Sequence, residues 1–330
     1  MPAIFHALLP VILMVSCGYL AGKLRWVSDQ GLKDISKLVF NLLGPALLFR
    51  TLSKVQLAEL DLSPVMMYHV LTLLWFTAWV MIYGLTQHGC MRALGGTYSN
   101  AVMIGIPMVS LAYGTQGLVY ILTLVSVHAL IILTYATLLF EIASAREAGR
   151  MPGTQVQSLR TTVLKAAKAA VLHPVSLPAF LGLMFSLTGF ELPELIDKPL
   201  DWLGRSFSPL ALIMVGIQLH QVLGRGKLGQ TKTDGSEPAV IWREVFQIVA
   251  LKNVFHPLLI LTGGYLLGLP PLPMTVMMLT ACMPVGANSY LFASRYKVRE
   301  AEVSVSLSLS VVFALVSVPA MLALQHAVTG

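Results

Sequence analysis

Charged residues are scarce in this chain. Only 11% of its 330 residues are Asp, Glu, Lys or Arg, whereas 56% are hydrophobic, and the mean hydropathy is +0.77. A soluble domain of this length needs more polar surface to cover its core. The composition therefore excludes an ordinary soluble protein and indicates a polytopic membrane protein built from α-helices.

Cysteines and catalytic motifs are also few. Cys17, Cys90 and Cys282 form no close pair, so the sequence predicts neither a disulfide framework nor a zinc site, and we expect small packing residues. The chain has no serine elbow, zinc-binding helix motif, phosphate loop or paired catalytic carboxylates. We therefore expect neither an enzyme nor a bound cofactor.

Acidic residues are missing from the depth of the predicted spans, which argues against a carboxylate-based relay for protons or cations. Asparagines and unwound backbone carbonyls could still hold sodium, and His128 or His256 could carry protons, so ion coupling stays open. Lys252 is the one clear cation within a span, and its charge costs roughly 3 kcal/mol there unless it is compensated. It could neutralise an anionic solute or an unwound helix end, or it could be a structural lysine bonded to carbonyls.

Long uncharged runs dominate the rest of the sequence. They cover residues 1–22, 62–91, 93–140, 169–190, 206–224, 253–294 and 303–330. A spanning helix needs about 20 apolar residues, so a run above about 40 must hold two crossings. With a further span near residues 37–53, the sequence predicts about ten transmembrane helices.

Positive charges fall mostly in one set of alternate loops. The loops between them hold only Arg50, Lys54, Lys198 and Arg205. Because basic loops stay on the cytoplasmic side and the number of helices is even, both termini are predicted to face the outside. The net charge of +7 then reflects topology and an anionic lipid leaflet, and it requires no nucleic acid. The polar stretches 142–168 and 224–243 are interpreted as a cytoplasmic linker and a cytoplasmic loop.

The chain also contains an internal repeat. Three residues recur 164 positions later, Pro10, Gly18 and Pro45 as Pro174, Gly182 and Pro209. We interpret residues 1–141 and 169–330 as two five-helix repeats. An odd number of crossings in each repeat turns the second upside down relative to the first, as in many secondary carriers.

The fourth span of each repeat carries helix-breaking residues beside an asparagine. The candidate binding residues in these two segments are Ser99, Asn100, Gly105, Pro107, Pro284, Gly286, Asn288 and Ser289. Proline and glycine interrupt a helix at membrane depth and free backbone groups that hydrocarbon cannot satisfy. Two helix N-termini meeting there would suit a carboxylate. The alternative is that these residues merely kink packed helices.

Three segments resemble motifs of the auxin efflux carrier family. Residues 98–107 resemble its fourth-helix motif, residues 284–296 its ninth-helix motif and residues 40–49 its second-helix motif. The resemblance implies a fold related to bile acid:sodium symporters, in which a domain with crossed broken helices slides against a scaffold of helices one, two, six and seven. It also implies that Asn100 contacts the substrate, that Pro284 marks the second crossing, that Gly44 and Pro45 line the site, and that a basic residue at position 252 is favoured.

Two departures from the plant members concern the substrate. Plant members usually have proline where Ser99 stands and asparagine where Val175 stands, and many have a long hydrophilic central loop that is missing here. The resemblance therefore implies a secondary carrier of a small organic anion, such as malonate or malate, with elevator-like alternating access in a bacterial inner membrane, so that both termini would face the periplasm. An exporter of an auxin-like aromatic carboxylate and a membrane receptor without transport remain alternatives, and a homodimer is a further possibility.

Overall fold

The computed structural model describes residues 2–55, 61–148, 176–224 and 240–329. These residues are almost entirely helical, and their only extended pairing is a single antiparallel bridge between Ser99 and Val285. Pro174, Val175 and most of the two predicted cytoplasmic segments lie outside the described residues. The predicted all-helical fold is confirmed.

The first half of the chain forms eight elements. They are α1 (Pro2–Lys23), α2 (Asp29–Leu38), the π-helical segment η1 (Val39–Leu43), α3 (Gly44–Ser53), α4 (Ser63–Tyr83), α5 (Gln87–Gly95), the π-helical segment η2 (Ala101–Gly105) and α6 (Ile106–Ala148). A straight helix as long as α6 would measure roughly 65 Å, about twice the hydrocarbon thickness of a bilayer. Gly114 resolves this, because its positive φ of 58° breaks the helical path and divides α6 into two parts.

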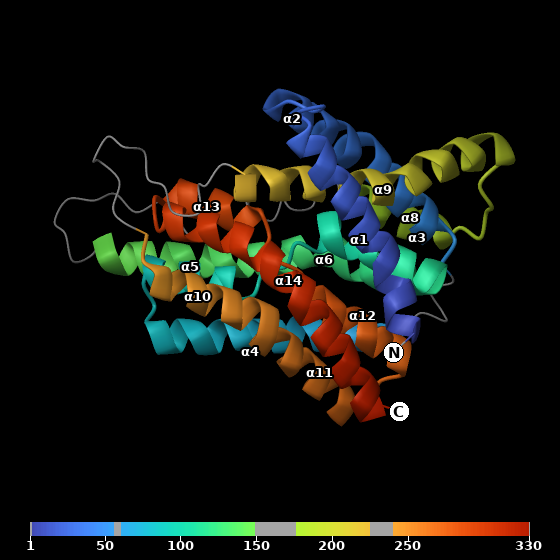
Figure 1. The fold of residues 1–330 in the computed structure, drawn as a ribbon. Helices are drawn as coiled ribbons and strands as arrows, with labels where there is room; N and C mark the ends of the chain where they lie inside the picture. The colour runs from blue at the N-terminus through green and yellow to red at the C-terminus, as the bar shows by residue number, and fades with distance from the viewer. Residues whose placement is uncertain (1, 56–60, 149–175, 225–239, 330) are drawn as a thin grey trace.

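The second half forms eight described elements. They are α8 (Ser176–Ser186), α9 (Glu194–Gly224), α10 (Trp242–Ala250), the π-helical segment η3 (Leu251–Phe255), α11 (His256–Leu266), α12 (Pro271–Cys282), α13 (Asn288–Tyr296) and, at the end, α14 (Glu300–Thr329). Within the described ranges, six helical stretches are long and apolar enough to cross a membrane, and three shorter helices are also apolar. The labelled ends of the chain lie on the same side of the molecule (Figure 1).

Each π-helical segment ends two positions before a proline. η1, η2 and η3 are followed after one residue by Pro45, Pro107 and Pro257. Proline has no N–H to donate, and its ring clashes with the carbonyl four residues earlier. A locally widened turn relieves this clash without ending the helix. The prolines therefore rotate the following helical face instead of simply bending the helix.

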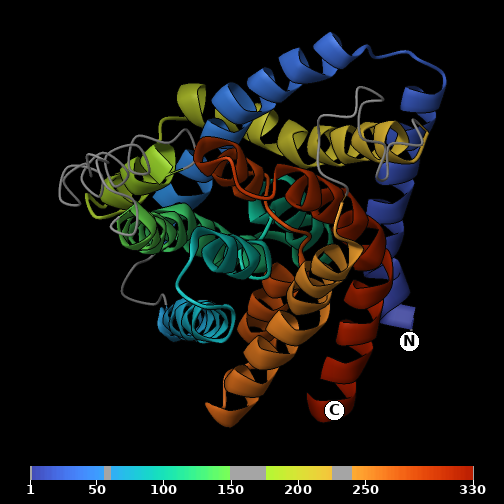
Figure 2. The ribbon, with the colours of Figure 1, turned by 90° about the vertical axis from the view of Figure 1, so that its left-hand side faces the viewer.

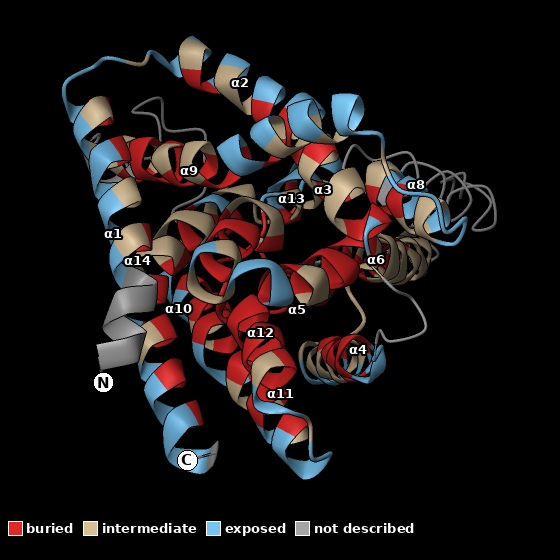
Figure 3. Cartoon of the chain, turned by 90° about the vertical axis from the view of Figure 1, so that its right-hand side faces the viewer, coloured by how far each residue is buried: buried red, intermediate tan, exposed pale blue. Residues whose placement is uncertain are grey.

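The helices pack in two groups that meet mainly along α6. One group contains α1, α3, α8 and α9, and the other contains α4, α5 and α10 to α14 (Figures 1 and 2). Buried residues concentrate in α5, α6 and α12, whereas α1, α4 and α14 each present an exposed face (Figure 3). The exposed face of α4 carries large apolar side chains, including Met66, Val70, Leu74 and Met81. An apolar exterior of this kind suits lipid rather than water.

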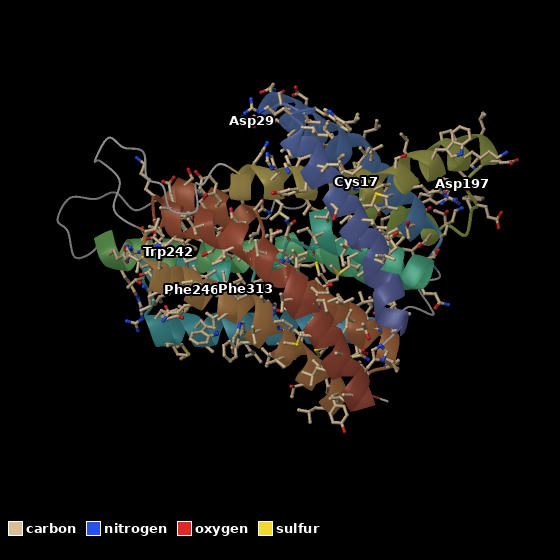
Figure 4. All side chains as sticks on the ribbon, viewed as in Figure 1. Cys17, Asp29, Asp197, Trp242, Phe246 and Phe313 are labelled. Atoms are coloured by element: carbon tan, nitrogen blue, oxygen red, sulfur yellow. The ribbon has the colours of Figure 1, made fainter. Side chains whose placement is uncertain are left out.

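The cysteines differ in exposure. Cys90 and Cys282 are buried, as expected for packing residues, whereas Cys17 is exposed on α1 (Figure 4). The prediction of a packing role is wrong for Cys17, because this side of α1 faces away from its neighbours. All three thiols are free.

Glycines bring α1 and α9 into backbone contact. A Cβ at Gly18 would lie 2.0 Å from the carbonyl oxygen of Ile213, and a Cβ at Gly216 would lie 2.0 Å from that of Val15. Small residues at such places allow close approach of membrane helices.

We expect Gly216→Ala to lower the unfolding temperature of the purified protein in detergent. The added methyl group can be accommodated only by separating α1 from α9, and overpacking of this kind costs about 1–3 kcal/mol. Gly22→Ala is the matched control, because its Cβ would meet only the His220 side chain, at 3.1 Å from its Cβ. Equal unfolding temperatures for the two variants would contradict the close contact.

Candidate functional site

The two interrupted helices cross and pair through their backbones. α5 ends at Gly95 and η2 begins at Ala101, while α12 ends at Cys282 and α13 begins at Asn288. Between these ends, the Asn100 N–H donates to the Pro284 carbonyl at 2.9 Å, and the Gly286 N–H donates to the Tyr98 carbonyl at 2.8 Å. Each break thereby satisfies backbone groups that the other leaves free.

Gly286 permits this close crossing. A Cβ at this position would lie 2.4 Å from the Tyr98 ring and 3.0 Å from the Ser99 carbonyl oxygen. The Tyr98 ring also stacks on His128, with ring centroids 5.0 Å apart, and its hydroxyl accepts a 2.9 Å hydrogen bond from the Asn288 side chain. Tyr98 therefore links the crossing to α6 and to the start of α13.

A cavity of about 250 Å³ opens beside the crossing. The residues that line it are Phe40, Tyr98, Ser99, Asn100, Ala101, Val102, Met103, Val125, His128, Ala129, Gly286, Ala287 and Asn288. A second cavity of about 280 Å³ lies against α9 and α14. Asn100 and Ala287 line both cavities, so the crossing separates two spaces.

The starts of two helices face the first cavity. The N–H groups in the first turn of a helix have no carbonyl within that helix to bond. Those of Ala101, Val102 and Met103 have no backbone acceptor among the described residues. The Asn100 side chain likewise has no hydrogen-bond partner in the described part of the chain. Together with the positive end of the helix dipole, these donors make the cavity suitable for an anion.

Lys252 lies behind the crossing and is fully buried. Its ammonium group donates to the Ala281 carbonyl in the last turn of α12. The neighbouring Asn253 amide donates to the carbonyls of Cys282 at 3.3 Å and Ser310 at 3.2 Å. A cation suits the negative end of a helix dipole, so Lys252 compensates the carbonyl end of α12 and does not line either cavity.

His128 and His256 belong to a buried cluster that also contains Tyr68 and His69. Tyr68 lies 5.8 Å from both predicted histidines, measured between ring centroids. Thr72 forms a 3.0 Å hydrogen bond with Nε2 of His256. Within the described ranges, both ring nitrogens of His128 lack a hydrogen-bond partner, and so does Nδ1 of His256. The structure brings the two predicted histidines together, and their role in proton transfer stays a prediction.

The structure brings only part of the predicted set to the first cavity. Its lining includes Ser99, Asn100, Gly286, Asn288 and His128. It does not include Gly44, Pro45, Gly105, Pro107, Lys252, His256, Pro284 or Ser289.

Packing explains several of these differences. Gly105 faces the side chains of Ile121 and Met283, and Gly44 faces the ring of Phe207. Ser289 is completely buried, and Pro284 contributes its carbonyl oxygen to the crossing. These residues shape the broken helices from behind.

Sequence reasoning missed the aromatic part of the lining. Phe40 and Tyr98 both lie in the cavity wall, and Tyr98 is hydrogen-bonded to Asn288. Both residues occur within the motifs identified in the sequence, next to Asn41 and Ser99. This position was the sequence signal that could have indicated their place in the cavity wall. Ser310, whose hydroxyl accepts a 3.0 Å hydrogen bond from the Val285 N–H, had no such signal because α14 carries many serines.

Comparison with known proteins gives similarity along most of the chain. A putative malonate transporter of Rhizobium meliloti is 24% identical over 333 residues, which cover 98% of this chain and 96% of that protein. The uncharacterized transporter YfdV of Escherichia coli is 22% identical and covers 94% of each chain. Auxin efflux carrier component 8 of Arabidopsis thaliana is 22% identical over 66% of this chain and 65% of its own length.

A family match covers nearly the whole sequence. The model of the family described as membrane transport protein matches residues 3–322. This range includes both interrupted helices, the cavity between them and the two groups of packed helices. The chain belongs to this family of membrane transport proteins, the auxin efflux carrier family.

Proposed function

We propose that the protein is a secondary carrier of a small dicarboxylate, such as malonate or malate. The observation that carries the proposal is the cavity into which the crossing directs unpaired amides and the Asn100 side chain. A carboxylate could accept hydrogen bonds from these groups without meeting an acidic side chain in the lining. The malonate named for the Rhizobium meliloti relative is a solute of this chemistry.

The described helices are compatible with ten crossings in two inverted repeats, residues 1–141 and 169–330. Gly18 packs against the Ile213 carbonyl, and Gly182 packs against the Phe49 carbonyl. Gly182 lies 164 residues after Gly18, and Phe49 lies 164 residues before Ile213. The first half supplies the glycine in one contact and the carbonyl in the other, so the two halves exchange roles. This exchange is what an inverted repeat predicts, and it supports the proposed repeat.

Alternating access would follow from movement between the two helix groups. The group of α1, α3, α8 and α9 corresponds to the scaffold that the family resemblance implies, and the crossing belongs to the other group. Both cavities beside the crossing reach residues of the scaffold group, namely Phe40 and the segment from Val215 to Gln221. Sliding the crossing along this boundary would carry the solute across the membrane.

Charge placement supports the proposed orientation in a bacterial inner membrane. Arg92 pairs with Glu244, and Arg299 lies 3.2 Å from the same carboxylate, at the end where α10 begins. Arg50 pairs with Asp197 at the other end of the molecule (Figure 4). The first end is the proposed cytoplasmic side, with both termini outside. Coupling to sodium or protons and a homodimeric state stay open within this proposal.

The direct test is flux of labelled malonate in proteoliposomes. Asn100→Ala should lower flux about tenfold or more, because a hydrogen bond to a charged group contributes about 1.5–3 kcal/mol. Asn41→Ala is the matched control, since this exposed asparagine lies outside both cavities. Parental flux in Asn100→Ala would contradict the site. Binding of malonate without flux in the parent would favour a receptor, and transport only of an aromatic carboxylate would favour the auxin-like alternative.

We further expect Gly286→Ala to abolish flux. The added methyl group would collide with the Tyr98 ring and the Ser99 carbonyl, so the two breaks could not pair as they do. Gly105→Ala is the control, because its Cβ would meet only side-chain atoms, of Ile121 at 3.1 Å and Met283 at 3.4 Å. Flux measured at matched protein content should separate the variants, and similar activities would argue against the need for a close crossing.

A further inference from the structure

A third cavity, the far cavity, lies away from the crossing. It measures about 470 Å³ and is bounded by the outer parts of α3 and α9 and by the segment of α6 around Gly114. Along α9, its lining spans residues 200–209, whereas the cavity against α9 at the crossing involves residues 215–221. The nearest lining residues on α9, Pro209 and Val215, are roughly 9 Å apart along the helix, and the two linings share no residue, so the two cavities are distinct.

Buried core side chains lie next to the far cavity. Phe207 is fully buried and lies against Gly44, where a Cβ would be 3.4 Å from its ring. Leu48, Ile106 and Val109 are also buried in this layer. The far cavity therefore adjoins a packed part of the core, and its lining shares no residue with either cavity at the crossing.

Two arginines and one aspartate give this far cavity a net positive lining. All three guanidinium nitrogens of Arg50 already have an acidic partner, because Nε and Nη2 contact Asp197 and Nη1 contacts Asp201. Arg205 uses only Nε, which lies 2.8 Å from Asp201. Its two terminal nitrogens have no partner within the described residues, and its side chain is 79% exposed.

Four hydroxyl groups complete the lining. Thr51, Ser110, Thr115 and Ser208 all face this cavity, and none has a hydrogen-bond partner in the described part of the chain. Serines and threonines in helices commonly bond the carbonyl three or four residues earlier, as Thr97 does here at 2.8 Å. The four hydroxyls and the open edge of Arg205 have no acceptor among the described residues, and together they are donors of the kind that a carboxylate accepts from.

We propose that this far cavity is a second site for the same organic anion, occupied on the periplasmic side before or after the solute reaches the crossing. The proposal rests on the proposed transport function and assigns Arg205 and the four hydroxyls to it. Arg205 binds one carboxylate through its terminal nitrogens, while Asp201 fixes the orientation of its guanidinium.

Sided transport measurements test the second site. Right-side-out and inside-out membrane vesicles expressing the protein are compared for malonate counterflow, with empty-vector vesicles subtracted. We expect Arg205→Gln to raise KM about tenfold from the periplasmic face and to leave KM from the cytoplasmic face within about twofold of the parent. Ser208→Ala should act in the same direction and less strongly, because it removes one neutral donor.

Lys198→Gln is the matched control for charge. Lys198 lies on the same helix and pairs with Glu194, but it does not line the far cavity. An equal rise of KM in Lys198→Gln and Arg205→Gln would show that positive charge anywhere on this surface attracts the anion, and it would overturn the site. A parental KM for Arg205→Gln at the periplasmic face would overturn it as well. Failure of the proposed function looks different, because the parent would then show no malonate counterflow in either type of vesicle.

Discussion

The antiparallel pairing of residues 98–100 with residues 284–286 is the constraint on which the arrangement depends. An interrupted helix exposes N–H and C=O groups, and hydrocarbon offers them no partner. In this chain each interruption supplies the acceptor that the other requires, through Asn100 to Pro284 and Gly286 to Tyr98. The pairing also fixes where η2 and α13 begin, and these starts set the chemistry of the neighbouring cavity.

Polar groups behind the crossing stabilise it from the protein side. Lys252 and Asn253 bond successive carbonyls at the end of α12, and Ser310 accepts the Val285 N–H. The buried lysine therefore acts on backbone that the crossing cannot satisfy itself. Burial of an unpaired ammonium group would be costly, and the carbonyl contact offsets part of that cost.

The sequence predicts the interrupted helices well because proline, glycine and asparagine have direct local consequences. It places Ser99, Asn100, Gly286 and Asn288 near a common site, and these residues line the same cavity. It does not predict which side of each segment faces that cavity. Gly105 illustrates the limit, since the π-helical turn before Pro107 rotates it towards Ile121 and Met283. Such a rotation depends on contacts between distant parts of the chain, and no local pattern encodes it.

The exposure of Cys17 has a practical consequence for following motion in this protein. The other two thiols are enclosed by neighbouring side chains, so a membrane-permeant maleimide added to the folded protein would attach at a single place on the lipid-facing side of α1. A fluorophore there sits in the helix group opposite the crossing. Paired with a second dye on α13, it would convert displacement between the two groups into an energy-transfer signal that requires no removal of native cysteines.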